Sequence, residues 1–322
     1  MADQLMAWLL AVLETLLFIG AAPLLAGWIK RVKCRLQNRK PPSLLQPYRD
    51  LRKLWRKQPI VPHPASWIFR IAPYVVFASA VLAASIVPLL AVNLPTERIA
   101  DVIVLVGLFA LGRTFLVLAG MDIGTAFGGM GSSREMTISS LAEPAMLMAV
   151  FTLAMSAHTT NLSQAMDYVL DTGLALRPSF VFAMLGLMLV AVAETGRIPV
   201  DNPATHLELT MIHEAMVLEY SGRYLGLMEW AAQIKLMLYG VLIVNIFLPW
   251  GIANELSWAA LAVGLAAVTL KLALLAVVLA LSEALFAKMR VFRVQEYLSF
   301  AYLLSVLGML SHIILEAPHV HH

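Results

Sequence analysis

Long apolar runs separated by short polar segments dominate this chain. The runs are continuous rather than alternating, so they predict membrane-spanning helices and argue against a membrane β-barrel, whose strands alternate in polarity. Most of them approach or exceed the roughly 20 residues that a helix needs to cross the bilayer core. The predicted spans cover about residues 5–29, 71–92, 99–119, 136–158, 179–193, 228–250, 258–281 and 297–315. We therefore expect an all-α integral membrane protein of about eight transmembrane helices, with residues 1–322 forming a single membrane domain.

The first polar segment, residues 30–70, is strongly basic and holds about half of the 23 Lys and Arg residues. The excess of positive charge predicts a cytoplasmic loop, and an eight-span topology then puts both termini outside. Apolar side chains recur within this loop near helical spacing, which predicts an amphipathic helix lying in the membrane interface. They are Leu44, Leu45, Tyr48, Leu51, Leu54 and Trp55.

The second polar segment, residues 194–227, is acidic and is predicted to be cytoplasmic as well. Its carboxylates are Glu194, Asp201, Glu208, Glu214 and Glu219. Pro199 and Pro203 block a regular helix at its start, and a short helix is predicted from about Thr205 to Leu218. Carboxylates between two spans are costly when they are buried without partners. A solvated loop is the alternative interpretation.

Several ionisable residues fall inside the predicted spans. Glu143 lies in the fourth span, Lys235 in the sixth and Lys271 near the middle of the seventh, with Glu283 at its inner end. A charge at the bilayer centre costs about 2.5–3.5 kcal/mol on insertion scales, so such residues are functional candidates by default. The alternative for Glu143 is a protonated side chain bonded to a neighbouring helix. Arg113, in the third span, either extends to the interface or forms an interior ion pair.

Composition agrees with a membrane protein and limits its chemistry. The chain is 60% hydrophobic and 13% charged, and its single cysteine leaves no set of ligands for an iron–sulfur cluster. The glycine-rich segment 120–135 is predicted to be an inner loop, and it lacks the Gly-Lys-Ser/Thr of a phosphate-binding loop. His206, His213 and Glu214 lack a further nearby ligand, and we expect no metal site. We expect the lipid bilayer as one partner and no nucleic acid.

Three segments carry a resemblance to a known family. They are Ala-Glu-Thr-x-Arg-x-Pro-x-Asp at 193–201 with Glu-Tyr-Ser-Gly at 219–222, the segment 35–54 of the basic loop, and the run from Ser133 to Pro144. Together they resemble the complex I subunit 1 family. Val200 stands where that family has Phe, and the interval from Asp201 to Glu219 is longer. These departures are similar to the branch found in energy-converting group 4 [NiFe] hydrogenases.

The resemblance implies a membrane subunit of a complex I-like hydrogenase, multi-pass in the inner (cytoplasmic) membrane. Such a subunit anchors a soluble redox module and couples electron transfer to proton or sodium translocation. The implied partners are hydrogenase large and small subunits, a ferredoxin-like iron–sulfur subunit and antiporter-like membrane subunits. The partners hold the [NiFe] centre and the iron–sulfur clusters, whereas this chain holds no cofactor and is not itself catalytic.

The resemblance also assigns roles to residues. Those expected to form a proton path or to couple it to redox change are Glu143, Glu194, Asp201, Glu208, Glu214, Glu219, Lys235, Lys271 and Glu283. Those expected to dock the soluble module are Arg35, Arg39, Gln46, Arg49, Asp50, Arg134, Arg197 and Arg223.

Three alternatives stay open at this point. The first is a quinone-binding membrane subunit of a complex similar to NADH–quinone oxidoreductase. Against it, Arg39-Lys40-Pro41-Pro42 lacks the glycine that many quinone-reducing relatives carry in this loop. The second is a stand-alone transporter, which predicts repeated halves that the sequence does not show. The third is a plain membrane anchor.

Overall fold

The structure, a computed structural model, describes residues 2–92, 94–172, 177–201, 211–253 and 257–316, and within these ranges it is helical, with isolated bridges but no strands. The α-helices are α1 (Ala2–Leu36), α2 (Gln46–Trp55), α3 (Trp67–Ile86), α4 (Val102–Asp122), α5 (Ala126–Ala157), α6 (Leu162–Thr172), α7 (Pro178–Glu194), α8 (His213–Val217), α9 (Gly222–Phe247), α10 (Trp258–Leu285) and α11 (Val291–Ser311). Two short turns of other helix type, η1 (Pro95–Ile99) and η2 (His312–Glu316), complete the described elements. The predicted all-α class is confirmed.

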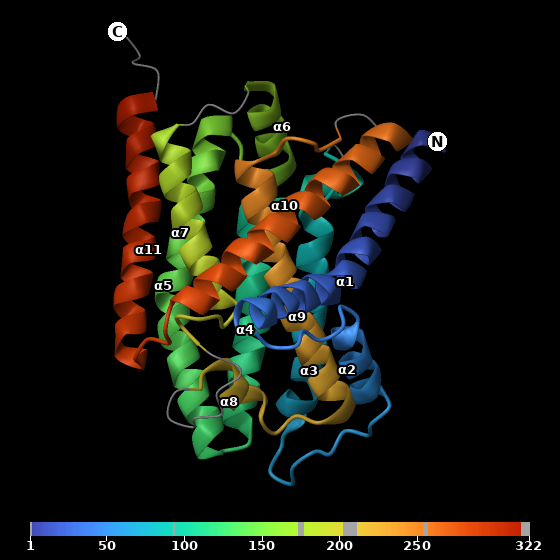
Figure 1. Ribbon diagram of the computed structural model, residues 1–322, viewed down its shortest axis with the longest axis vertical. Coiled ribbons are helices and arrows are strands. Elements are labelled where there is room, and N and C mark those ends of the chain that lie inside the picture. Colours follow the sequence, from blue (N-terminus) through green and yellow to red (C-terminus); the bar gives the residue numbers. More distant parts are fainter. Residues whose placement is uncertain (1, 93, 173–176, 202–210, 254–256, 317–322) are drawn as a thin grey trace.

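Seven helices in the described ranges are long and apolar enough to span a membrane: α1, α3, α4, α5, α9, α10 and the last helix, from Arg293 to Leu315. The remaining predicted span, residues 179–193, is α7. Its 17 residues make it shorter than the seven spanning helices. A helix of that size is about 26 Å long, close to the thickness of the bilayer core. The start of α1 and the end of α11 lie at the same end of the molecule (Figure 1), as an even number of crossings requires.

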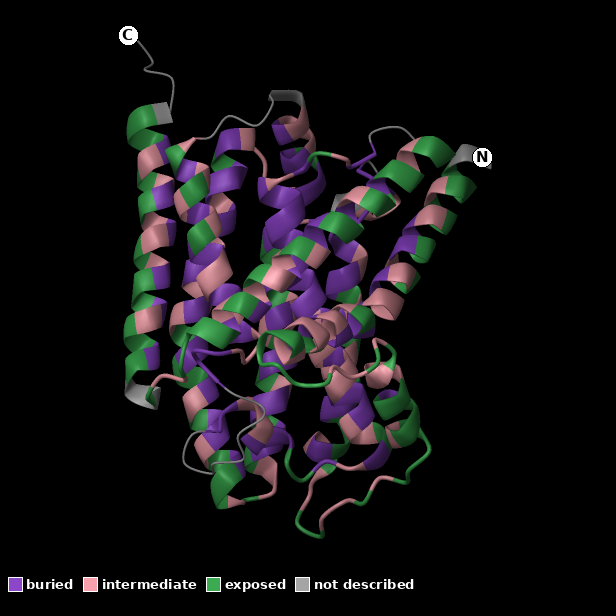
Figure 2. Cartoon of the chain, viewed as in Figure 1, coloured by how far each residue is buried: buried purple, intermediate pink, exposed green. Residues whose placement is uncertain are grey.

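The helix α9 forms the centre of the molecule. The most apolar window of α9 is 78% buried, against 28% for those of α1, α10 and the last helix. Figure 2 shows the exposed positions gathered along the outer helices. We call the end of the molecule with α6 and the start of α1 the α6 end, and the end with α2 and α8 the α8 end (Figure 1).

The amphipathic helix predicted in the basic loop is present as α2, and its place in the membrane interface stays a prediction. Its Leu51 is buried, and its Tyr48 hydroxyl donates to the backbone carbonyl of Gly20 on α1. Trp55 lies edge-on to Trp230 of α9, with 6.5 Å between ring centroids. The apolar face of α2 therefore packs on α1 and α9.

The glycine-rich segment predicted as a loop is helical instead, and this prediction was wrong. The helix α5 begins at Ala126, where the Thr125 hydroxyl accepts a hydrogen bond from the Gly128 amide at 3.3 Å. Gly124 forms the short turn between α4 and α5, whereas Gly128 and Gly131 serve close packing. A Cβ at Gly131 would lie 2.8 Å from the Ile212 carbonyl oxygen beside α8. Gly in a helix costs stability, but here it lets α8 approach.

Two further expectations differ from the structure. The outer loop expected after the fourth span contains α6, which buries Leu162, Ala165 and Met166 against the core. The helix predicted from about Thr205 is seen only as α8, because residues 202–210, with His206 and Glu208, lie outside the described residues. The backbone at Met211 and Ile212 is not helical. The predicted helix is therefore wrong at these two residues, and its predicted start at Thr205 lies outside the described residues.

Candidate functional site

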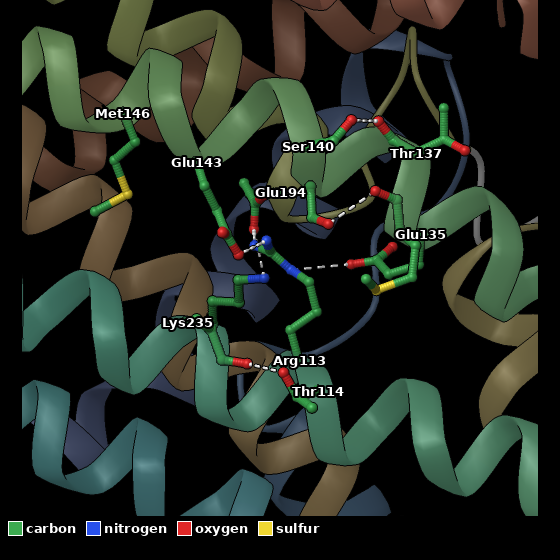
Figure 3. A network of polar contacts seen from close by, with 12 residues as sticks. Arg113, Thr114, Glu135, Thr137, Ser140, Glu143, Met146, Glu194 and Lys235 are labelled. Atoms are coloured by element: carbon green, nitrogen blue, oxygen red, sulfur yellow. Dashed lines mark hydrogen bonds and ion pairs between the residues drawn. The ribbon is translucent and has the colours of Figure 1, made fainter.

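An arginine inside the membrane domain gathers carboxylates from two other helices. Arg113, on α4, is 5% exposed. Its guanidinium donates through Nη1 to Glu143 Oε1 and through Nη2 to Glu194 Oε2, while its Nε lies 3.5 Å from Glu135 Oε1. Figure 3 shows the arginine side chain among these three carboxylates. Of the two alternatives for Arg113, the interior ion pair is the one that forms.

Four helices meet at this cluster, which we call the Arg113 cluster: Arg113, Glu135, Glu143, Glu194 and Lys235. Glu135 and Glu143 lie about two turns apart on α5, so their side chains share a face. Glu194 ends α7, and Lys235 of α9 donates to its Oε2 at 2.8 Å. Three of the predicted proton-path residues, Glu143, Glu194 and Lys235, are therefore brought together.

The charges of the Arg113 cluster do not balance. Three carboxylates face two cations, so full ionisation leaves one negative charge uncompensated. The Glu194 Oε1 atom is buried and has no hydrogen-bond partner among the described residues. The cluster thus offers an acceptor for one proton.

A cavity of about 90 Å³ adjoins the cluster and is lined by Arg113, Glu135, Glu194, Lys235 and, from α8, His213. This volume accommodates several water molecules beside polar partners. The Glu143 side chain is 34% exposed, whereas that of Glu194 is 2% exposed. The arrangement can pass protons between a hydrated cavity and a more exposed carboxylate on α5.

The segment that follows Glu194 is held by a second set of ion pairs. Glu283, buried near the end of α10, accepts from Lys33 at 2.6 Å and from Arg197 at 2.9 Å. Asp201 pairs with Lys288 at 2.8 Å and accepts the Ile212 amide at 3.2 Å. Two more predicted residues, Asp201 and Glu283, therefore position the acidic segment against α1 and α10.

The Glu-Tyr-Ser-Gly motif fixes the start of α9. The Tyr220 hydroxyl donates to the Phe69 carbonyl at 2.9 Å, and the two rings stack with centroids 4.0 Å apart. The Ser221 hydroxyl accepts the Ile60 amide at 2.8 Å. Burial raises the pKa of the Tyr220 phenol, and the nearby Asp122 carboxylate raises it further. Glu219 itself is exposed.

Lys271 lies apart from the Arg113 cluster. Its ammonium donates to Asn245 Oδ1 at 3.2 Å and to the carbonyls of Leu248 and Trp250 at 2.9 and 3.2 Å. Asn245 is about 15 Å beyond Lys235 along α9. Between them the buried ring of Tyr239 fills the core. Backbone carbonyls, rather than a carboxylate, offset the burial of this charge.

The predicted docking residues divide into two groups. Five are exposed: Arg35, Arg39, Arg49, Asp50 and Arg223. The half-buried Gln46 donates to Asp50 Oδ1 at 2.9 Å. Arg134 instead donates to the Met211 carbonyl at 2.9 Å, and Arg197 pairs with Glu283. The last two hold the acidic segment to the membrane domain.

Sequence reasoning gives no site role to Arg113 and none to Glu135. Arg113 is the only ionisable residue within its predicted span, 99–119, apart from Asp101 at the edge, and that isolation is the available signal. Glu135 is predicted to lie in a loop because the preceding glycines favour a turn. Once α5 is extended to Ala126, Glu135 falls on the same helix face as Glu143. Glu214, on α8, is half-buried.

Comparison with known proteins agrees with the resemblance of the three sequence segments. The sequence profile described as NADH dehydrogenase matches residues 8–314. The chain is 32% identical over 285 residues to formate hydrogenlyase subunit 4 of Escherichia coli strain K12, a match that covers 88% of this chain and 92% of that protein. It is also 32% identical over 280 residues to hydrogenase-4 component C of the same organism, covering 87% and 88%.

More distant relatives include a subunit of the NADH-quinone oxidoreductase of Salinibacter ruber, 27% identical over 237 residues, covering 70% of this chain and 68% of that protein. The fold is similar to a chain in the structure of the membrane-bound sulfane sulfur reductase, an archaeal respiratory membrane complex. That match has a TM-score of 0.76 at 20% identity and covers 94% of this chain and 98% of the other. At this identity the likeness concerns the fold alone.

Proposed function

This chain belongs to the NADH dehydrogenase family, and we propose that it is the membrane subunit of a complex I-like, energy-converting [NiFe] hydrogenase. The two relatives at 32% identity carry hydrogenase and formate hydrogenlyase names, whereas the quinone oxidoreductase relative from Salinibacter ruber is 27% identical over a smaller share of the chain. In this role the chain anchors a soluble redox module in the inner membrane. It couples electron transfer in that module to translocation of protons or sodium ions.

The proposed partners hold the redox chemistry. The [NiFe] centre and the iron–sulfur clusters belong to hydrogenase large and small subunits and to a ferredoxin-like subunit. The exposed cations at the α8 end, among them Arg49 and Arg223, supply charge for docking that module. Antiporter-like membrane subunits are the proposed recipients of the proton or its charge.

The Arg113 cluster is the observation that carries the proposal. A change of charge in a docked redox module alters the potential at the α8 end, where His213 and the hydrated cavity lie. Three carboxylates share two cations, so one negative charge is uncompensated. A change in potential alters which carboxylate binds a proton most readily, and the proton moves to that carboxylate. The proton reaches Glu194 from the cavity and leaves through the more exposed Glu143. The Arg113 guanidinium stays between the carboxylates and stabilises those that are ionised.

The experiment that tests the proposal separates electron transfer from ion movement. Inverted membrane vesicles with the assembled complex are assayed for hydrogen turnover and for acidification, in the wild type and in Glu143→Gln. The matched control is Glu296→Gln, an exposed glutamate on α11. We expect Glu143→Gln to lower the number of protons moved per electron at least several-fold while the complex stays assembled. An unchanged ratio in an assembled Glu143→Gln complex would leave only the membrane-anchor role.

A second candidate function, quinone binding, is favoured by one specific observation. An apolar cavity of about 200 Å³ lies between α1, α7, α9 and α10, and Thr195 lines both this cavity and the one beside Arg113. Its other polar lining residues are Tyr239 and Ser282. An isoprenoid tail fits such a lining. Photolabelling of the complex with a quinone analogue distinguishes the candidates, since specific labelling of α9 or α10 favours the quinone reductase.

A further inference from the structure

A second group of buried ionisable side chains lies toward the α6 end and is separate from the Arg113 cluster. Glu14 on α1 is 6% exposed and Lys271 on α10 is 3% exposed. Neither forms an ion pair with any residue that the structure describes. Both connect instead to the loop 88–91 that follows α3. Buried charges that are not paired require an explanation, because the unfavourable free energy of desolvation must be offset.

Among the residues that the structure describes, backbone amides hold Glu14. Its Oε1 accepts the Ala91 amide at 3.1 Å and its Oε2 accepts the Leu89 amide at 3.4 Å. Hydrogen bonds to an ionised carboxylate are commonly about 2.7–2.9 Å. These bonds are longer, so the site stabilises the anion weakly, and protonation of one oxygen sacrifices little bonding.

A narrow crevice leads from Glu14 toward the surface. Its volume is about 10 Å³, roughly that of one water molecule. The polar residues Thr15, Ser85, Thr96 and Ser163 line it, and Thr15, Ser85 and Thr96 are partly exposed. Of the described residues in the lining, Glu14 alone is ionisable. The side chains of Glu97 and Arg98, in the neighbouring turn η1, lie outside those described.

Lys271 is linked to Glu14 through the loop. Its three hydrogen bonds match the three protons of an ammonium group. Asn245 accepts one of them and donates through its Nδ2 to the carbonyls of Pro88 and Leu89 at 2.9 and 3.2 Å. The loop therefore presents amides to Glu14 and carbonyls to the Asn245 amide, so its peptide dipoles lie between opposite charges.

We propose that Glu14 is a proton-binding site open to the aqueous phase at the α6 end and electrostatically linked to Lys271 through loop 88–91. The proton passes from water in the crevice to a Glu14 oxygen. The group of Glu14 and Lys271 then changes from zero net charge to one positive charge, and release of the proton reverses this. No electron is transferred. The site does not depend on the proposed hydrogenase role, because none of its contacts involves the Arg113 cluster.

Carbodiimide labelling of the intact complex in native membranes tests the proposal. A hydrophobic carbodiimide adds a protonated carboxyl group across its C=N bond and leaves a stable acylurea, which peptide mass spectrometry locates. We expect Glu14 to be labelled, and increasingly so as the pH falls. Glu283 is the internal control, because Lys33 at 2.6 Å and Arg197 at 2.9 Å occupy its two carboxylate oxygens, and we expect it to stay unlabelled. Absence of label on Glu14 throughout the pH range in which the complex stays assembled would overturn the proposal.

The link to Lys271 needs a variant. Lys271→Met removes the positive charge, so we expect Glu14 to bind its proton more readily and the labelling profile to shift to higher pH. Lys271→Arg keeps the charge and should leave the profile in place. If Glu14 has only a structural role, the two variants should show the same profile, and that result would also overturn the link.

Discussion

The Lys235 ammonium lies 2.8 Å from the Glu194 Oε2 atom, and that same oxygen accepts the Arg113 guanidinium. One carboxylate oxygen is therefore shared by two cations, from α9 and from α4. The other oxygen, Oε1, is buried with no hydrogen-bond partner among the described residues. Because Glu194 ends α7, any change in its charge acts directly on the segment that leads into the acidic region.

Glu194→Gln should destabilise the membrane domain, because Lys235 loses its ion-pair partner and Arg113 keeps only Glu135 and Glu143. Breaking a buried ion pair typically costs about 3–5 kcal/mol. The double variant Glu194→Gln with Lys235→Met removes the cation that is left without a partner and should recover part of that loss. Thermal unfolding of the purified complex, arranged as a double-mutant cycle, measures both effects. A single variant as stable as the wild type would contradict this prediction.

Glu283→Gln should loosen the acidic segment without disturbing the Arg113 cluster. Lys33 and Arg197 both lose their partner, so the backbone around Arg197 becomes accessible. We expect faster tryptic cleavage after Arg197 in the variant complex, measured by mass spectrometry over time. Glu296→Gln is the matched control, because that exposed glutamate has no ion pair among the described residues. Equal cleavage rates in the two variants would argue against a positioning role for Glu283.

The spans were predictable from the sequence because hydrophobic periodicity and length act locally. The amphipathic helix α2 was predictable for the same reason, from Leu51 and its neighbours. The segment around Gly128 and Gly131 was not, since glycine was interpreted by its backbone freedom. In the fold Gly128 lies against the Gly120 carbonyl of α4, and Gly131 is small because α8 packs against it. The contact with α8 joins residues far apart in the sequence, and no local sequence pattern predicts it.

Part of the site followed from the sequence for a similar reason. Glu143 and Lys235 stand out because lipid excludes charge, whatever their partners are. The partners themselves depend on which helices meet, and that is why Arg113 could be seen as unusual but not assigned to Glu143, Glu194 or solvent. Lys271 shows the opposite case. Its charge near the middle of a predicted span marks it as a functional candidate, but the sequence does not show that two backbone carbonyls and the Asn245 side chain accept its hydrogen bonds.

Docking through the α8 end should depend on exposed cations. Arg49 lines an open basic groove with Arg52, Lys53, Arg56 and Lys57. We expect Arg49→Glu combined with Arg223→Glu to release the soluble subunits from membranes at a lower salt concentration than the wild type, because exposed charges are screened by salt. The control is Arg177→Glu, which changes the charge at the start of α7, toward the α6 end of the molecule. Retention at the same salt concentration in the double variant would remove these residues from the docking surface.

Alkaline conditions should destabilise the fold through Tyr220. Its phenol has an ordinary pKa of 10.0 in an unfolded chain, and burial raises that pKa in the fold. The folded state therefore favours the neutral phenol, and the resulting stability is present below pH 10 and is lost as the pH rises above it. Tyr220→Phe should lower stability at neutral pH by about 0.5–1.5 kcal/mol for the lost bond to Phe69. It should also flatten the decline in stability above the ordinary phenol pKa, as measured by thermal unfolding across a pH series.

Gly222 gives the sharpest test of how α9 begins. Its φ is +55°, a left-handed conformation that costs other residues about 1–2 kcal/mol. A Cβ there would also lie 2.6 Å from the carbonyl oxygen of Gln58. We therefore expect Gly222→Ala to destabilise the complex by more than the conformational cost alone, and to expose the 57–61 segment to proteolysis.

The matched control for that variant is Gly129→Ala. Gly129 lies inside α5, and a Cβ there would meet nothing within 4 Å. The same chemical change should therefore stabilise the protein by about 0.5–1 kcal/mol, because alanine loses less backbone entropy in a helix. Opposite signs for the two substitutions would show that the close approach at Gly222, rather than added volume in general, fixes the start of α9. If both were neutral, the contact between Gln58 and α9 would have no part in holding the acidic segment against the membrane domain.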